Sequence, residues 1–153
     1  MRETLEILRL YHAAALAART PEFYVRARQR KSYLTPEVIA RHGLGLAPTL
    51  RECLAAGLTE LELRAVGLLC DPVSDGPDRS PYLFFRDCII IPYYRTDGTG
   101  PVYFSSRRLS DTRADGTLLD KGKKALCMRR PGEDGRGGVE RPAFWCPREM
   151  RTA

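Results

Sequence analysis

The chain has 153 residues, of which 43% are hydrophobic and 29% charged, a composition typical of one globular domain that needs no metal or disulfide to fold. No apolar run reaches the ~18–20 residues of a membrane span, so we expect no membrane partner. Residues 1–78 carry ten basic and ten acidic side chains and residues 79–153 carry fifteen and nine, so the net charge of +6 lies in the second half and favours a polyanionic partner such as nucleic acid.

The first half of the chain is predicted to be a cluster of short helices. Residues 4–18 place apolar side chains at helical spacing, which gives that helix one face for a core. The sequence Thr-Pro-Glu at 20–22 and again at 35–37 combines an N-cap hydroxyl, a proline at the first helical position and an acid near the positive end of the helix dipole. Thr49 and Thr59 are expected to open two further short helices.

The second half is predicted to form a sheet. Residues 71–81 are rich in proline and indicate an exposed connection, after which β-branched and aromatic residues dominate. Two apolar runs flank Asp97-Gly98 and give the strongest hairpin signal in the chain. Pro92 indicates that the first of these strands is an edge or is bulged there. Residues 125–128, ALCM, are a plausible third strand.

We therefore predict an α+β fold, with an N-terminal cluster of short helices followed by a small antiparallel β-sheet. The domain is expected to cover residues 1–130, with its helical part at 1–70 and its sheet part at 82–130. Residues 131–153 start with a glycine-rich, charged stretch and are predicted to be a flexible C-terminal segment.

The cysteines are predicted to be structural. They include no Cys-x-x-Cys pair, which argues against a metal site. An odd number of thiols, together with an opening segment interrupted by charges, fits a reducing compartment, and we expect a cytoplasmic protein. The five cysteines are Cys53, Cys70, Cys88, Cys127 and Cys146.

No catalytic motif stands out, since GxSxG, P-loop, GxGxxG and HExxH sequences are all missing. His12 falls on the amphipathic helix, and His42 falls near a helix C-terminus, where it complements the dipole. The acidic residues lie mainly in caps, turns and helix faces. We expect no catalytic residue, metal or cofactor in this chain. An enzyme that draws on the scattered acids and cysteines remains an alternative.

Basic residues gather at the end of the second helix, on the hairpin strands and before the third strand. On the hairpin they alternate with aromatic residues, which is the chemistry of single-strand binding, where bases stack on rings and cations contact phosphates. A strand with one buried and one solvated face is the alternative explanation. The binding candidates are Arg30, Lys31, Arg86, Arg107, Arg108, Lys123 and Lys124, and the stacking candidates are Tyr103 and Phe104.

Three segments in order resemble a known family. They are EVIARHGLGLAP at 37–48, FFRDCIIIPYYRTDGTGPVYFSSRRL at 84–109 and KKALCM at 123–128. Over about residues 8–130 the chain resembles the N-terminal subdomain of the catalytic core of DnaG-type bacterial and phage primases. In that family this subdomain precedes the TOPRIM metal-binding domain and supplies basic residues that hold the template strand.

The resemblance implies roles for individual residues. Arg86 would be the arginine before the first long strand, Arg107 the arginine of the family's F-G-G-R, and Lys124 the lysine of its K-Y-L-N. Ser105-Ser106 replaces the two glycines, and ALC at 125–127 replaces the tyrosine and asparagine, which predicts a looser hold on the template. The family's zinc ribbon and TOPRIM acids have no counterpart, so Mg²⁺ or Mn²⁺ is expected only in a TOPRIM domain.

The predicted function is a phage-like module that binds single-stranded template DNA for RNA primer synthesis in DNA replication. It is not expected to be catalytic alone, because the DNA-directed RNA polymerase activity would reside in a TOPRIM domain. The expected partners are single-stranded DNA or an RNA–DNA hybrid, separate TOPRIM and zinc-ribbon segments, and a replicative helicase within a primosome. The alternative is a protein-interaction module that docks on such a helicase.

Overall fold

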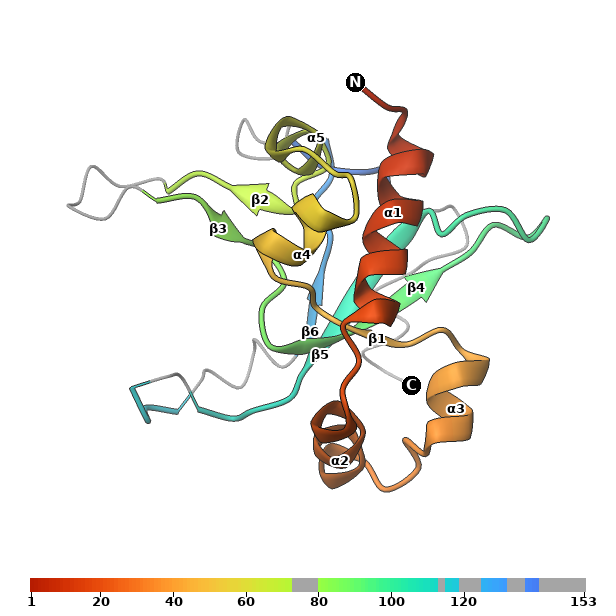
Figure 1. The fold of residues 1–153 in the computed structure, drawn as a ribbon, viewed down its shortest axis with the longest axis vertical. Coiled ribbons are helices and arrows are strands. Elements are labelled where there is room, and N and C mark those ends of the chain that lie inside the picture. The colour runs from red at the N-terminus through yellow and green to blue at the C-terminus, as the bar shows by residue number, and fades with distance from the viewer. Residues whose placement is uncertain (73–79, 113–114, 119–124, 132–136, 141–153) are drawn as a thin grey trace.

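The computed structural model describes residues 1–72, 80–112, 115–118, 125–131 and 137–140. Its helices and strands confirm the predicted α+β class (Figure 1). The helices are α1 (Thr4–Ala17), α2 (Pro21–Arg30), α3 (Pro36–Arg41), α4 (Leu50–Ala55) and α5 (Glu60–Ala65). The strands are β1 (Gly45–Leu46), β2 (Leu69–Cys70), β3 (Tyr82–Leu83), β4 (Cys88–Tyr93), β5 (Tyr103–Arg108) and β6 (Ala125–Cys127).

Threonine side chains start four of the helices, as predicted. The hydroxyls of Thr20 and Thr35 accept hydrogen bonds from the backbone N–H groups three residues later, and a proline follows each threonine. Thr49 and Thr59 form capping boxes, in which the carboxylate of the glutamate three residues later accepts a hydrogen bond from the backbone N–H of the threonine. These signals are local, and each one sets its helix start at the expected residue.

The predicted hairpin is confirmed as β4 and β5, which pair antiparallel from Cys88 opposite Arg108 to Tyr93 opposite Tyr103. Its turn contains Asp97-Gly98, with Gly98 at a φ of 83° that a side chain would strain. The strand order in the main sheet is β1-β4-β5-β6, and β2 and β3 form a separate pair. The third predicted strand corresponds to β6.

The position of Pro92 differs from the prediction. β4 is an inner strand, since it pairs with both β1 and β5. β1, however, is only two residues long and places Gly45 opposite Ile90 and Leu46 opposite Ile89. Pro92 therefore stands beyond the last residue paired with β1, where its missing N–H interrupts no hydrogen bond to that strand.

Alternate side chains of β4 enter two different hydrophobic clusters, because successive residues of a strand face opposite ways. Ile90 belongs to the main core with Tyr11 of α1, whereas Ile89 packs with Phe23 of α2 and Ile39 of α3. Figure 1 shows α1 crossing the sheet and α2 and α3 together at the end nearest β1. α2 and α3 are thereby fixed against the residues of β4 that α1 does not cover.

The approach of α1 to β1 depends on Gly45. A Cβ at this position would lie 2.8 Å from backbone and side-chain atoms of Ala15. Because Gly45 has no side chain, α1 can pack directly against β1. This contact fixes the position of the sheet edge beside α3.

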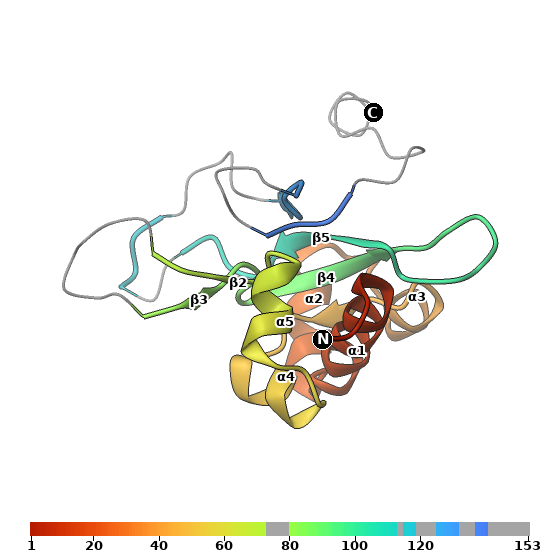
Figure 2. The same cartoon turned by 90° about the horizontal axis from the view of Figure 1, so that it is seen from above.

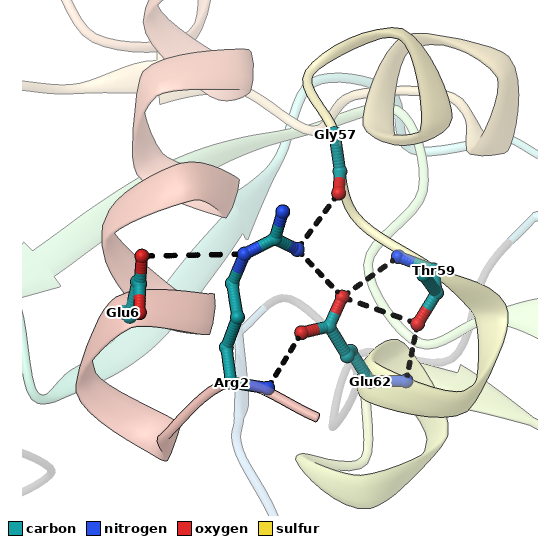
Figure 3. A network of polar contacts seen from close by, with 5 residues as sticks. All are labelled: Arg2, Glu6, Gly57, Thr59 and Glu62. Atoms are coloured by element: carbon teal, nitrogen blue, oxygen red, sulfur yellow. Dashed lines mark hydrogen bonds and ion pairs between the residues drawn. The ribbon is translucent and has the colours of Figure 1, made fainter.

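A polar network ties the start of α1 to the start of α5 (Figure 3). Glu62 is only 3% exposed, and its carboxylate accepts hydrogen bonds from the backbone N–H and the guanidinium of Arg2 and from Thr59. The same guanidinium donates to the carbonyl of Gly57 and lies 4.0 Å from Glu6. Burial raises the pKa of Glu62, but the hydrogen bonds from Arg2 and Thr59 outweigh that effect and lower it.

Part of the predicted flexible segment packs on the domain. Val139 is 6% exposed and joins the main core, and its N–H donates to the carbonyl of Arg129. Figure 2 shows residues 137–140 running above β4 and β5, with α1 and α4 below them. Val139 is therefore packed in the core rather than flexible, because an apolar side chain within reach of the core is buried. The predicted domain boundaries stay untested.

None of the helices in the described part of the chain has the length and apolarity that crossing a bilayer requires.

Candidate nucleic-acid interface

A groove of about 1010 Å³ lies between the α2–α3 region and the strands β4 and β5. Its floor is apolar and its walls are basic and aromatic. Its lining consists of Arg30, Lys31, Tyr33, Leu34, Val38, Arg41, His42, Leu44, Ile89, Ile91, Pro92, Tyr94, Arg107, Arg108 and Asp111.

The register of the hairpin places a cation beside the apolar floor. Ile89 and Ile91 belong to the face of β4 that packs on α2 and α3. Arg107 is paired with Ile89, and directly opposed residues share a face, so its side chain rises beside that floor. Arg107 is exposed, unlike its neighbours in β5. The groove therefore offers a guanidinium in solvent next to an apolar surface.

The charge of the groove is strongly positive. Among the described residues, five cations from three separate parts of the chain line it, against one carboxylate, that of Asp111. Arg30 at the end of α2 donates to Asp111 Oδ2 at 2.8 Å, and Arg108 at the end of β5 contacts Oδ1 at 3.3 Å. The cations are Arg30, Lys31, Arg41, Arg107 and Arg108. Such a surface attracts phosphates.

Two tyrosines in the groove were missed from the sequence. Tyr33, between α2 and α3, is 65% exposed, and Tyr94, just after β4, is 40% exposed. Partial burial raises the pKa of Tyr94, whose ring packs edge-on against His12. A signal did exist, because Tyr33 follows Arg30 and Lys31 closely, but only the tertiary fold shows that the ring is exposed.

Four of the predicted binding residues meet in this groove, namely Arg30, Lys31, Arg107 and Arg108. Arg86 does not line it; its guanidinium lies 5.7 Å from the ring centre of Tyr82, in a cation–π contact. Lys123 and Lys124 fall outside the described residues, so their prediction stays open.

The stacking prediction for Tyr103 and Phe104 is wrong. Both rings are 0% exposed. The Tyr103 hydroxyl donates to the carbonyl of Met128 at 2.8 Å, and the Phe104 ring packs at 5.4 Å from that of Tyr11. Each face of β5 is covered at this end of the strand, so alternation with cations does not expose these rings.

The groove presents cations and aromatic rings. Among the described residues, no three His, Cys, Asp or Glu side chains come together as metal ligands. Burial raises the pKa of both Cys53 and Cys88 to about 12, so these thiols stay protonated at neutral pH. Exposed cations beside exposed rings are instead the elements that hold a nucleic-acid strand.

The architecture matches solved structures. The RNA polymerase domain of Mycobacterium tuberculosis primase DnaG, in complex with double-stranded DNA with a 6-nucleotide overhang, superposes with a TM-score of 0.60 over 81% of this chain, at 23% identity. This is the fold of part of the DnaG primase catalytic core. A DnaG primase catalytic domain bound to single-stranded DNA gives 0.57 over 81% at 22% identity, and the E. coli primase catalytic core gives 0.51 over 94% at 19% identity.

The match is one of fold. The chain spans 37%, 36% and 39% of the lengths of those three DnaG chains. No protein-family model matches the sequence, and no curated protein does so either.

Proposed function

We propose that this chain is the single-strand-binding module of a DnaG-type primase, equivalent to the N-terminal subdomain of its catalytic core, and that its groove holds the template backbone. The observation that carries the proposal is the meeting of five cations from α2, α3 and β5 around an apolar floor. The fold shared with DnaG structures, including one bound to single-stranded DNA, supports it.

The lining favours a single strand over a duplex. Ile89 and Ile91 form an apolar floor, and Tyr33 presents an exposed ring at the rim. In a duplex the base faces are stacked on each other, whereas an unpaired base has a free face for a ring. Phosphate contacts carry no base information, so little sequence preference is expected.

Primer synthesis itself would take place on another segment or chain. The described residues provide no ligand set for Mg²⁺ or Mn²⁺. In this proposal a TOPRIM domain holds the metal ions, and the groove positions the template strand, or the RNA–DNA hybrid formed on it, beside that site.

Fluorescence anisotropy with a labelled oligothymidine tests the proposal. The affinity should fall with salt by about 0.7 log units per log unit of salt for each phosphate that is neutralised. Arg107→Ala and Lys31→Ala should weaken binding and reduce that slope. Arg9→Ala and Arg51→Ala remove exposed cations outside the groove and serve as matched controls. The proposal would be contradicted if the affinity did not change with salt concentration. It would also be contradicted if all four variants weakened binding equally.

The helical half favours a second candidate, a protein-docking module for a partner such as a replicative helicase. Leu54 on α4 and Leu61 on α5 are 45% and 66% exposed, which gives the helical half two apolar contact points for a partner. Leu54→Ser with Leu61→Ser should abolish capture of a purified helicase and leave oligothymidine binding intact. The groove variants should have the opposite effect.

A further inference from the structure

Asp111 is the acidic residue among the described residues that line the groove, and its carboxylate contacts two arginines from different elements. Oδ2 accepts from Arg30 Nη1 at 2.8 Å, and Oδ1 lies 3.3 Å from Arg108 Nη2. The side chains of Arg30 and Arg108 are 28% and 9% exposed, whereas that of Asp111 is 55% exposed. A half-exposed anion therefore sits between two guanidinium groups that are largely removed from water.

Each guanidinium makes one contact to this anion, and arginine binds phosphate oxygens through the same kind of charge-assisted hydrogen bond. The side chain of Arg108 is only 9% exposed, so its contact with Asp111 is largely shielded from water. A backbone phosphate carries the same single negative charge as a carboxylate and likewise offers two strong acceptor oxygens. It can therefore take over the contacts that Asp111 makes to both arginines.

The Arg30–Asp111 contact is not what holds α2 in place. One turn earlier on the same helix, Arg26 makes two short hydrogen bonds to Asp87, at 2.7 and 2.8 Å, outside the groove lining. Phe23 is buried at the packing face of the same helix. Exchange of Asp111 for another anion would therefore leave α2 docked.

From this arrangement we infer that Arg30 and Arg108 form a phosphate subsite in the groove and that Asp111 occupies it until a backbone phosphate of single-stranded DNA displaces it. The inference rests on the proposed function. The Asp111 carboxylate thus acts as a competing anion. It weakens the binding of single-stranded DNA and makes that binding reversible.

The test compares Asp111→Asn with Asp87→Asn in oligothymidine binding. Both substitutions remove one carboxylate that pairs with an arginine of α2, but only Asp111 lies in the groove. Asp111→Asn should tighten binding by roughly three- to fivefold, which corresponds to the loss of one exposed competing ion pair. Asp87→Asn should tighten it less, through net charge alone.

The salt dependence provides a second readout. The slope counts the phosphates that are neutralised and so release their condensed cations. In the wild-type chain Asp111 competes for the two arginines, so the phosphate at this subsite is neutralised only in part. In the Asp111→Asn variant it is neutralised fully, so the salt slope should steepen by up to about 0.7. Asp111→Glu keeps the competing charge and should retain the wild-type affinity and slope.

Equal affinities and slopes for D111N and D87N would overturn the subsite and leave the proposed function standing. If D111N binds oligothymidine and the wild-type chain does not, the subsite is supported, and Asp111 blocks it more strongly than a competing anion of similar affinity would. Failure of every variant to bind oligothymidine would overturn the proposed function and, with it, the inference.

Discussion

Arg26 and Asp87 form a two-point ion pair that joins α2 to the residue preceding β4, with Nη1–Oδ1 and Nη2–Oδ2 distances of 2.7 and 2.8 Å. Asp87 adopts a φ of 47°, and its carbonyl accepts a hydrogen bond from the N–H of Leu109. Hydrogen bonding to Arg26 lowers the pKa of Asp87. One residue therefore connects the helix to both strands of the hairpin.

Asp87→Asn should destabilise the fold by about 0.5–1 kcal/mol, because the pair is partly exposed and screened by solvent. Asparagine tolerates a positive φ, so the substitution isolates the ion pair. Asp87→Ala should cost more, since alanine adds backbone strain. Urea unfolding measures the stability of both variants. Equal unfolding midpoints would show that backbone strain at position 87 adds nothing to the cost of the alanine variant.

Tyr33→Ala should weaken oligothymidine binding about five- to tenfold, near the lower end of the ~1–3 kcal/mol that stacking of one base contributes. The ring is 65% exposed, so its loss should barely change the unfolding midpoint. Tyr33→Phe keeps the stacking face and should bind like the wild-type chain. If Tyr33→Phe binds as weakly as Tyr33→Ala, the hydroxyl rather than the ring makes the contact.

The stability of the fold should depend on the ionisation of Glu62. Its pKa is lowered in the folded state, so its contribution is present above the unfolded value of about 4.3 and is lost as the pH falls through the folded value. Glu62→Gln should lower the melting temperature at neutral pH and flatten its decline below about pH 5. Glu60→Gln, on the same helix but exposed, is the control. Parallel pH profiles for wild type and Glu62→Gln would count against the network of Figure 3.

Two buried thiols should be unreactive in the folded chain. Burial raises the pKa of Cys53 and Cys88 to about 12, so both are protonated and inaccessible at neutral pH. Alkylation followed by peptide mass spectrometry should therefore leave Cys53 and Cys88 unmodified in the folded chain. In urea both should be modified. Early labelling of Cys88 in the folded chain would show that the main core opens readily.

The elements of the fold were predictable because their signals are local. Thr20 and Thr35 cap their helices through bonds three residues away, and Asp97-Gly98 forms its turn from its own side chain and backbone. The surroundings of Pro92 were harder to predict. Whether Pro92 lies at a sheet edge depends on where β1 ends, and β1 comes from the other half of the chain. Val139 was missed for the same reason, because its burial depends on distant residues.

The groove was only half predictable. Arg107 and Arg30 are recognisable as cations from the sequence, but their meeting depends on α2 packing against β4. The alternation of aromatic residues and cations on the hairpin was interpreted as single-strand-binding chemistry, a prediction that requires the Tyr103 and Phe104 rings to be exposed. In the fold, packing covers both faces at that end, and the exposed rings belong to loops such as that of Tyr33.

The pairing of Gly45 with Ile90 also affects the order in which the chain can fold. α3, α4 and α5 have six residues each, too few to persist as isolated helices even with good caps. They become stable only when the hairpin supplies a surface, and β1 can join the sheet only after a long loop has closed. We therefore expect the β4–β5 hairpin to form early and the helical half to condense on it. Residues 1–70 expressed alone should remain largely unfolded.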